Sequence, residues 1–214
     1  MLSKDDDQLR SKQLRVLYQK LLKMHGWQNW WVSKPPFEII IGAILVQNTN
    51  WINVDKSLTI LHEKNCLTPQ KLNGLTLEVL ALYIKPSGLY NQKARYLKNF
   101  TEWYLSCGSF EGLKKYKTAY LRKALLNING IGRETADVIL LYVFHRPVFI
   151  IDNYTQRLLI QLGIIEKKWK YDDLQNLFYE ALPPNVKIYS EYHALIVHHG
   201  KLKHSSPVME LKIK

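Results

Sequence analysis

The residue types best suited to chemistry are concentrated between residues 124 and 157. A turn formed by Gly130, Ile131 and Gly132 separates two apolar helical patterns. Glycine adopts backbone conformations that other residues avoid, and a helix beginning at about Arg133 would point its free N–H groups out of the turn. The pattern predicts a binding site for an anion such as phosphate, with Ile131 packed inward between the helices.

A carboxylate, Asp152, follows the short apolar run Val148–Ile151 and precedes a helical pattern. Aspartate is a preferred N-cap residue, so a purely structural role as a helix cap is one interpretation of Asp152. An ionised carboxylate can also stabilise a developing positive charge or orient an attacking water molecule. The two roles are compatible on one side chain.

The composition of the whole chain is that of a folded and basic protein. Its 214 residues are 47% hydrophobic and 22% charged, which is typical of globular proteins. Lys and Arg number 30 against 18 Asp and Glu, giving a net charge of +12. This balance favours a polyanionic partner, most simply nucleic acid, over a generically basic soluble protein.

Cysteine content and hydropathy exclude several other classes. Only Cys66 and Cys107 occur and there is no CxxC motif, which disfavours disulfide frameworks and cysteine metal sites. The polar N-terminus does not resemble a signal peptide. The longest apolar run, Ile39–Val46, is less than half a membrane span. We therefore expect a cytoplasmic protein with no membrane segment.

The elements that must position these residues are predicted to be almost entirely helical. A first helix begins near Asp5–Asp7 and stops at Gly26, and FEIIIGAILVQ, apolar on every face, predicts a centrally buried helix. Val148–Ile151 could form a strand, but it is short and isolated. Further helices are expected over 51–64, 76–84, 91–106, 118–126, 133–144, 153–162, 171–181 and 188–200.

Four segments resemble the helix-hairpin-helix base-excision DNA glycosylases, the superfamily of endonuclease III. In chain order they read FEIIIGAILVQNTNW, PSGLYNQKARYL, LNINGIGRETADVILLYVF and VFIIDNYTQRLL. The resemblance covers about residues 30–200. Within the superfamily, the chain looks most like the small bacterial type III 3-methyladenine-DNA glycosylases.

The resemblance implies an all-α, two-domain helix-hairpin-helix DNA glycosylase fold with a cleft between the domains. One domain would span 28–146 and end with the hairpin, and the other would combine 1–27 with 147–214. An everted base would enter the cleft, with Asp152 as the catalytic residue at its mouth. The hairpin residues expected to hold DNA are Gly130, Ile131, Gly132, Arg133 and Thr135.

A base within the DNA stack must be flipped out before it can be hydrolysed. Gln47 is predicted to plug the gap that the base leaves, and Leu89 to act as an apolar wedge. The purely structural alternatives are a polar residue at a helix end for Gln47 and a core leucine for Leu89.

Tryptophans are the candidates for stacking on the flipped base. We expect Trp30 and Trp51 to form the pocket, with Trp31 behind them and Lys201 close by. Alkylated purines are cationic and suit an electron-rich indole face. The alternative places these tryptophans in the core, and that is our interpretation of Trp27.

Position 134 separates two chemistries. Bifunctional family members have a lysine two residues after the second hairpin glycine, where this chain has Glu134. A carboxylate cannot form an imine, which predicts hydrolysis without strand cleavage. The expected function is a monofunctional glycosylase for alkylated purines such as 3-methyladenine. Alternatives are an endonuclease III-like glycosylase for another lesion and a non-catalytic helix-hairpin-helix DNA-binding protein.

Cofactors and partners follow from the same resemblance. Many relatives hold an iron–sulfur cluster on four cysteines, but His204 stands where the first would follow the segment His199–Lys201, and no cluster is expected. His193, near His198 and His199, is interpreted as structural rather than as a zinc ligand. A monovalent cation held by hairpin carbonyls would be consistent with the family. The expected partner is double-stranded damaged DNA, bound by a monomer associated with the bacterial nucleoid.

Overall fold

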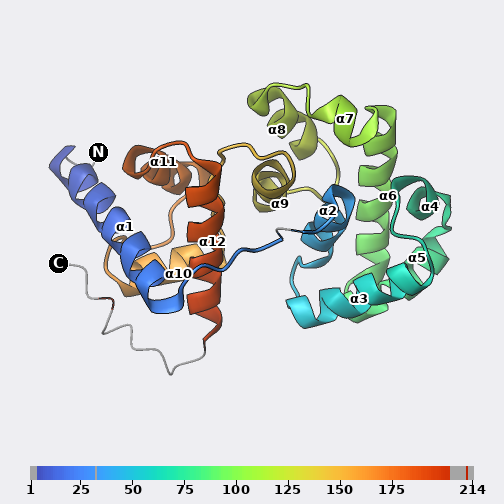
Figure 1. Ribbon diagram of the computed structural model, residues 1–214, viewed down its shortest axis with the longest axis horizontal. Helices are drawn as coiled ribbons and strands as arrows, with labels where there is room; N and C mark the ends of the chain where they lie inside the picture. The colour runs from blue at the N-terminus through green and yellow to red at the C-terminus, as the bar shows by residue number, and fades with distance from the viewer. Residues whose placement is uncertain (1–3, 32, 203–210, 212–214) are drawn as a thin grey trace. The chain divides into compact units, whose positions relative to one another are not determined.

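The computed structural model describes residues 4–31, 33–202 and 211, and over these residues it is mainly helical with no β-strand. It divides into two compact units (Figure 1). The terminal unit combines residues 1–32 with 145–214, and the central unit spans residues 33–144. The boundaries expected from the sequence were 28 and 146. Trp30 and Trp31 therefore belong to the terminal unit, although the sequence placed them in the central one.

The centre of the central unit is helix α2 (Pro36–Leu45), as its uniformly apolar sequence predicts. Every residue from Phe37 to Leu45 is buried. Pro36 occupies the first turn, where its missing N–H costs nothing. Gly42 gives the Trp51 ring room to pack on α2, because a Cβ at Gly42 would lie 3.1 Å from that ring.

The remaining helices of the central unit agree closely with the predicted ranges. The elements not predicted are α4, η1 and α7, which are too short to show a period of 3.6 residues. The elements are α3 (Trp51–Glu63), α4 (Pro69–Gly74), α5 (Leu77–Tyr83), η1 (Lys85–Ser87), α6 (Tyr90–Ser106), α7 (Ser109–Leu113), α8 (Thr118–Leu126) and α9 (Arg133–Val138).

The predicted helix over 133–144 changes its geometry midway. It begins as α9 and continues as a π-helical turn, η2 (Ile139–Val143). All five residues of η2 are buried. Apolar periodicity cannot distinguish this wider turn from an α-helix when every residue is apolar and buried.

The terminal unit is built from helices at both ends of the chain (Figure 1). Helix α1 packs against α11 and α12, and α10 packs against α12. The Tyr192 hydroxyl donates to the Leu14 carbonyl at 2.9 Å and so ties α12 to α1. The bounds are α1 (Lys4–His25), α10 (Asn153–Gln161), α11 (Tyr171–Ala181) and α12 (Val186–Lys201).

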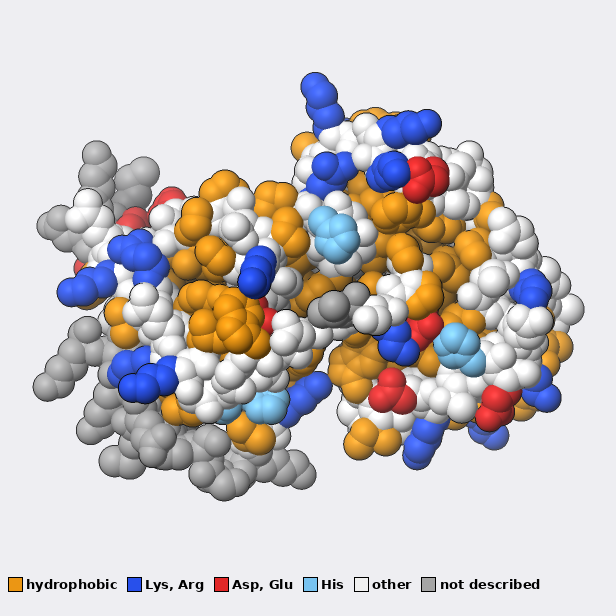
Figure 2. Space-filling view, in the orientation of Figure 1, with side chains coloured by type: hydrophobic (Ala, Val, Ile, Leu, Met, Phe, Trp, Pro, Cys, Tyr) orange, Lys and Arg blue, Asp and Glu red, His pale blue; other side chains and the backbone are white. Residues whose placement is uncertain are grey.

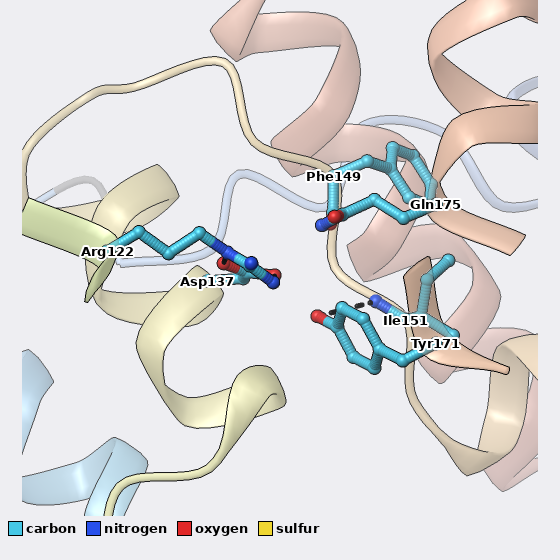
Figure 3. Close-up of polar contacts among 6 residues, drawn as sticks. All are labelled: Arg122, Asp137, Phe149, Ile151, Tyr171 and Gln175. Carbon is cyan, nitrogen blue, oxygen red and sulfur yellow. Dashed lines mark hydrogen bonds and ion pairs between the residues drawn. The ribbon is translucent and has the colours of Figure 1, made fainter. Parts of the chain in front are cut away.

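The apolar run before Asp152 is buried and is not a strand. Side chains of α11 supply the hydrogen bonds that a neighbouring strand would have given. The Gln175 amide donates to the Phe149 carbonyl, and the Ile151 N–H donates to the Tyr171 hydroxyl at 3.3 Å (Figure 3). Buried backbone groups need such partners, so these side chains let an extended segment cross the core.

Three other expectations concerned Trp27, the basic segment near the C-terminus and membrane segments. Trp27 is 50% exposed and lies beneath the Lys187 ammonium, so placing it in the core was wrong. The basic segment after Leu202, with His204, lies outside the described residues apart from Leu211. No helix in the described part of the chain is both long enough and apolar enough to cross a membrane.

Candidate functional site

The two hairpin glycines serve different purposes. Gly130 has a φ of +95°, and a Cβ at this position would lie 2.1 Å from the Tyr96 ring. Gly130 is therefore required both by its backbone conformation and by the approach of α6. Gly132 has a φ of −86°, which any residue can adopt, and a Cβ there would meet nothing within 4 Å. Its missing side chain leaves open space at the beginning of α9.

The hairpin is stabilised by an inward-packed isoleucine and by an ion pair between α8 and α9. Ile131 is 4% exposed, which confirms that it packs inward. Arg122 on α8 binds both carboxylate oxygens of Asp137 on α9, with N–O distances of 2.7 and 2.9 Å (Figure 3). Asp137 is fully buried. The pair joins α8 to α9 across the hairpin.

Exposed basic side chains surround the segment leading into the hairpin. Figure 2 shows Lys and Arg side chains gathered over the α7–α8 part of the central unit. Glu134 is also exposed, in the first turn of α9. Thr135 differs from Glu134 because it is buried, with only 6% of its surface exposed. The exposed basic residues are Lys114, Lys115, Lys117, Lys123 and Arg133.

Gln47, the predicted plug, connects the end of α2 to the hairpin. Its side-chain amide donates to the Gly130 carbonyl at 2.9 Å and to the Thr135 hydroxyl at 3.1 Å. Gln47 is only partly exposed. Any role as a plug is therefore combined with bracing the hairpin turn.

Leu89, the predicted wedge, projects from the turn before α6. It is 57% exposed, which excludes the alternative of a core leucine. Its φ is +47° and that of Gly88 is +69°, so two successive residues have positive φ angles, and Leu89 itself is left-handed. Such a conformation costs a residue with a Cβ on the order of 1 kcal/mol or more, and it persists where the surroundings enforce it.

Asp152 is the N-cap of α10, as its sequence position predicts. Its Oδ1 atom accepts hydrogen bonds from the Thr155 N–H and the Thr155 hydroxyl, both at 2.7 Å. The side chain is 8% exposed. Both bonds use Oδ1, and Oδ2 makes neither of them. The cap fixes the direction of the carboxylate without using its second oxygen.

The loop that carries Trp30 is attached to α12. The buried carboxylate of Glu191 accepts the backbone N–H groups of Gln28 and Asn29, the latter at 3.3 Å. The Trp31 ring centroid lies 6.1 Å from that of Trp30. A buried charge hydrogen-bonded to two amides is a strong anchor, so the segment immediately before Trp30 is held by α12.

Two side chains of α12 lie beside the Trp30 ring. The Lys201 ammonium lies 5.5 Å from the ring centroid, as the sequence predicted for its neighbourhood. His193, which the sequence did not assign to the site, stands edge-on to Trp30 with centroids 6.0 Å apart. One signal was available: His193 and Lys201 are eight residues apart and so share a face of α12.

The charges of this cluster influence one another. Burial lowers the pKa of His193, which the Asp152 carboxylate partly offsets and the Lys201 ammonium reinforces. Partial burial also lowers the pKa of Lys201, and Asp152 opposes that shift. Asp152 therefore lies within electrostatic range of both residues. The terminal unit therefore holds four candidate site residues, namely Asp152, Trp30, His193 and Lys201.

A second histidine cluster lies at the end of α1. His25 Nε2 is 3.0 Å from His199 Nδ1, and the His25 ring meets that of His198 edge-on at 4.9 Å. Burial first, and the neighbouring histidines second, lower the pKa of His25 and of His199. Within the described ranges, no group of three or more His, Cys, Asp or Glu residues is arranged to hold a metal ion.

Trp51 and the hairpin residues belong to the central unit. The contribution of Trp51 to the same pocket as Trp30 stays a prediction. So does a monovalent cation at the hairpin, where the Ile128 carbonyl accepts from Ile131 N–H at 3.0 Å.

Comparison with known sequences identifies a single family. The family model described as "HhH-GPD superfamily base excision DNA repair protein" matches residues 41–184. The Methanocaldococcus jannaschii protein named "Putative DNA repair glycosylase MJ1434" is 43% identical over 188 residues, 86% of either chain. Endonuclease III of Sulfolobus acidocaldarius is 31% identical over 170 residues, which cover 77% of this chain and 72% of the relative.

Solved structures give the same result. The crystal structure of H. pylori 3-methyladenine DNA glycosylase bound to 1,N6-ethenoadenine is 31% identical, with a TM-score of 0.76 over 90% of this chain and 97% of that one. A non-covalent endonuclease III–DNA complex has a TM-score of 0.77 over 99% of this chain and 95% of the other. Its identity of 24% supports the fold alone. The expected all-α helix-hairpin-helix fold is confirmed.

Proposed function

The chain belongs to the HhH-GPD superfamily of base excision DNA repair proteins, and from this premise we propose that it is a monofunctional DNA glycosylase that removes alkylated purines such as 3-methyladenine. Family membership makes it a DNA glycosylase. The lesion and the absence of strand cleavage are the proposed parts. The observation that carries the proposal is the cluster in which Trp30, whose loop is held by Glu191, is flanked by Lys201 and shares the terminal unit with the Asp152 carboxylate.

An alkylated purine suits the Trp30 ring because the purine is positively charged, and the Asp152 carboxylate offsets the positive charge of Lys201 in the same cluster. An indole face attracts a cation by about 0.5–2 kcal/mol. His193 is buried and its pKa is lowered, so a neutral ring would stand beside Trp30 and would not repel a cationic base. The relative bound to 1,N6-ethenoadenine, named a 3-methyladenine glycosylase, supports the same class of lesion.

The proposed reaction breaks the bond between the sugar C1′ and the base nitrogen. The base takes the bonding electrons and, having been cationic, leaves neutral, while the sugar becomes an oxocarbenium ion. Asp152 stabilises that ion by about 4 kcal/mol at a separation of about 4 Å and an effective dielectric near 20. Water then adds to C1′ and loses a proton, for which Oδ2 of Asp152 is the candidate acceptor.

The absence of strand cleavage rests on Glu134. Bifunctional members of the family use a lysine amine that attacks C1′, and a carboxylate at that position cannot form the imine. Glu134 is exposed in the first turn of α9. We expect the product to be an intact strand with an abasic site.

An iron–sulfur cluster does not fit the chain. The cluster needs four thiolates after α12, whereas the sequence has two cysteines. Cys66 and Cys107 both lie in the central unit as free thiols. No step of the proposed reaction uses a metal. The predicted monomeric state stays a prediction.

Incubation with methylated duplex DNA tests the proposal. We expect free 3-methyladenine by chromatography, and strand breaks only after alkali. Direct cleavage that is trapped by borohydride would contradict the monofunctional assignment. Glu134→Lys is the matched variant, since it restores the amine at the position where bifunctional members carry it.

A different lesion is the second candidate, because several sequence relatives are named endonuclease III. Parallel assays on oxidised and mismatched duplexes separate the two. Binding without release of any base would instead favour the non-catalytic alternative.

A further inference from the structure

A lysine buried in the first turn of α6 plays no part in the proposed chemistry. Lys93 is 2% exposed and is among the largest fully buried side chains of the protein. Its ammonium donates to the Leu45 carbonyl and to the Ser87 carbonyl, both at 2.7 Å. Burial lowers its pKa to about 8. Taking an ammonium group out of water is costly, whereas an apolar residue of similar length would fill the same space without that cost.

The first carbonyl belongs to the end of α2. Leu45 is the last residue of that helix, and such carbonyls lack a partner within the helix and carry its partial negative charge. An ammonium satisfies both requirements. Gln47 follows two residues later and is hydrogen-bonded to the hairpin. The Lys93 contact therefore fixes the point from which Gln47 leaves α2.

The second carbonyl belongs to the turn that presents Leu89. Ser87 is fully buried, and its hydroxyl donates to the Ile84 carbonyl at 2.7 Å. Gly88 and Leu89 follow with positive φ angles. The Lys93 N–H in turn donates to the Leu89 carbonyl at 2.9 Å. One residue thus holds the turn on both sides of its strained tip through its side chain and its backbone.

We propose that Lys93 is a positioning residue that sets the spacing between Gln47 and Leu89, the two side chains predicted to enter the DNA stack when a base is flipped out. The cross-link joins the end of α2 to the turn before α6. It holds Leu89 in a left-handed conformation that a flexible turn would relax. The inference rests on the proposed function, because it assigns both side chains to base flipping.

Lys93→Met tests this role, because methionine has a similar length and cannot donate hydrogen bonds. The matched control is Lys98→Met. Lys98 is also on α6 and donates to two backbone carbonyls, Asn73 and Leu75, but it joins α6 to the α4–α5 segment instead of the Leu89 turn. Both variants remove one lysine charge and two carbonyl contacts, so they differ in which segments are released.

The assay must measure base flipping separately from cleavage of the glycosidic bond. A duplex with a stable abasic analogue and 2-aminopurine in the opposite strand reports insertion of the wedge by its fluorescence, with no bond broken. We expect Lys93→Met to reduce that signal and the single-turnover rate of base release by about tenfold to a hundredfold, as displaced contacts do. DNA affinity should change less than about threefold. Lys98→Met should leave all three near the wild-type values.

A double-mutant cycle decides whether Lys93 acts through Leu89. In a Leu89→Ala background, Lys93→Met should cost less than about twofold further, because the tip it positions is gone. An equal loss with and without Leu89 would overturn the proposal. So would equal losses in the Lys93 and Lys98 variants. If Lys93→Met does not fold, Lys93→Gln, which keeps an amide donor, replaces it in the same cycle.

Different results would contradict the proposed lesion and the positioning role of Lys93. If the wild-type protein releases no base from methylated DNA yet gives the fluorescence change on the abasic duplex, the proposed lesion is wrong and the Lys93 comparison still applies. If neither Leu89→Ala nor Lys93→Met alters that fluorescence, the positioning role is wrong whatever the lesion.

Discussion

In the central unit two cationic side chains are bound to backbone carbonyls or to a carboxylate, whereas in the terminal unit two ionisable side chains lie beside an indole ring. Lys93 binds two carbonyls, and Arg122 is paired with Asp137. By contrast, Lys201 and His193 flank Trp30 at longer range. The first arrangement fixes backbone positions. The second leaves charges able to respond to a bound group, which agrees with the proposed catalytic role of the terminal unit.

Asp152→Asn should show the largest effect, because it removes the carboxylate charge to which we assign the catalytic role. The rate of base release should fall by about three orders of magnitude, the equivalent of roughly 4 kcal/mol of charge stabilisation. Asparagine is also a good N-cap, so the unfolding free energy should change little. Single-turnover release and fluorescence anisotropy measure rate and DNA affinity separately. Near-normal release by this variant would remove Asp152 from the mechanism.

Gly130→Ala should destabilise the central unit. The new Cβ would meet the Tyr96 ring at 2.1 Å in a left-handed backbone conformation. We expect a loss of about 2–4 kcal/mol in the free energy of unfolding, measured by urea denaturation. Gly132→Ala is the control, with a stability loss of about 1 kcal/mol or less. Its Cβ points into open space, so it should weaken DNA binding instead. Equal stability losses in the two variants would contradict the division of roles between the glycines.

Trp30→Ala tests whether the Trp30 ring in the terminal unit contributes to the proposed activity. Loss of the indole face should reduce kcat/KM for 3-methyladenine by about tenfold, equivalent to roughly 1.4 kcal/mol. Trp27→Ala is matched to it, since Trp27 also has a lysine over its ring but is half exposed and lies outside the cluster. The second variant should stay within about twofold of the wild type. Similar losses in both would show that the loop as a whole, and not the Trp30 ring, is important.

Acid should weaken the terminal unit, with the smallest of these effects. The folded protein lowers the pKa of His25 and of His199, so below pH 6.5 the unfolded chain binds more protons than the folded one. The stability that neutral imidazoles provide is complete above pH 6.5 and is lost as the pH falls. His25→Gln should flatten the decline of unfolding free energy between pH 7.5 and 5.5. An unchanged slope in the variant would exclude this cluster as its source.

Sequence reasoning succeeded where one local signal determined the outcome. The uniformly apolar α2 had to be buried, and an aspartate before a helical pattern had to be a strong candidate for a cap. Ile131 packs inward because it lies between two glycines at the turn. The four family segments also gave the fold class, because their order and spacing are specific.

The partners of polar residues could not be predicted from the sequence. Nothing local shows that Arg122 pairs with Asp137, that Lys93 turns inward, or that His193 meets Trp30, since each depends on how separate helices pack. Val148–Ile151 has the composition and length of a strand, yet helix α11 provides its hydrogen bonds. Trp27 was misplaced because an aromatic residue in a loop carries no periodic signal.

The division of the terminal unit between both ends of the chain has a consequence for its synthesis on the ribosome. The central unit is one continuous segment and can fold as soon as residue 144 has emerged. Helix α1 emerges before the central unit but must wait for α11 and α12, because the Tyr192–Leu14 hydrogen bond spans 178 residues. Its apolar face stays uncovered throughout that interval. During that interval we therefore expect α1, rather than the hairpin, to be the segment that still lacks its packing partners.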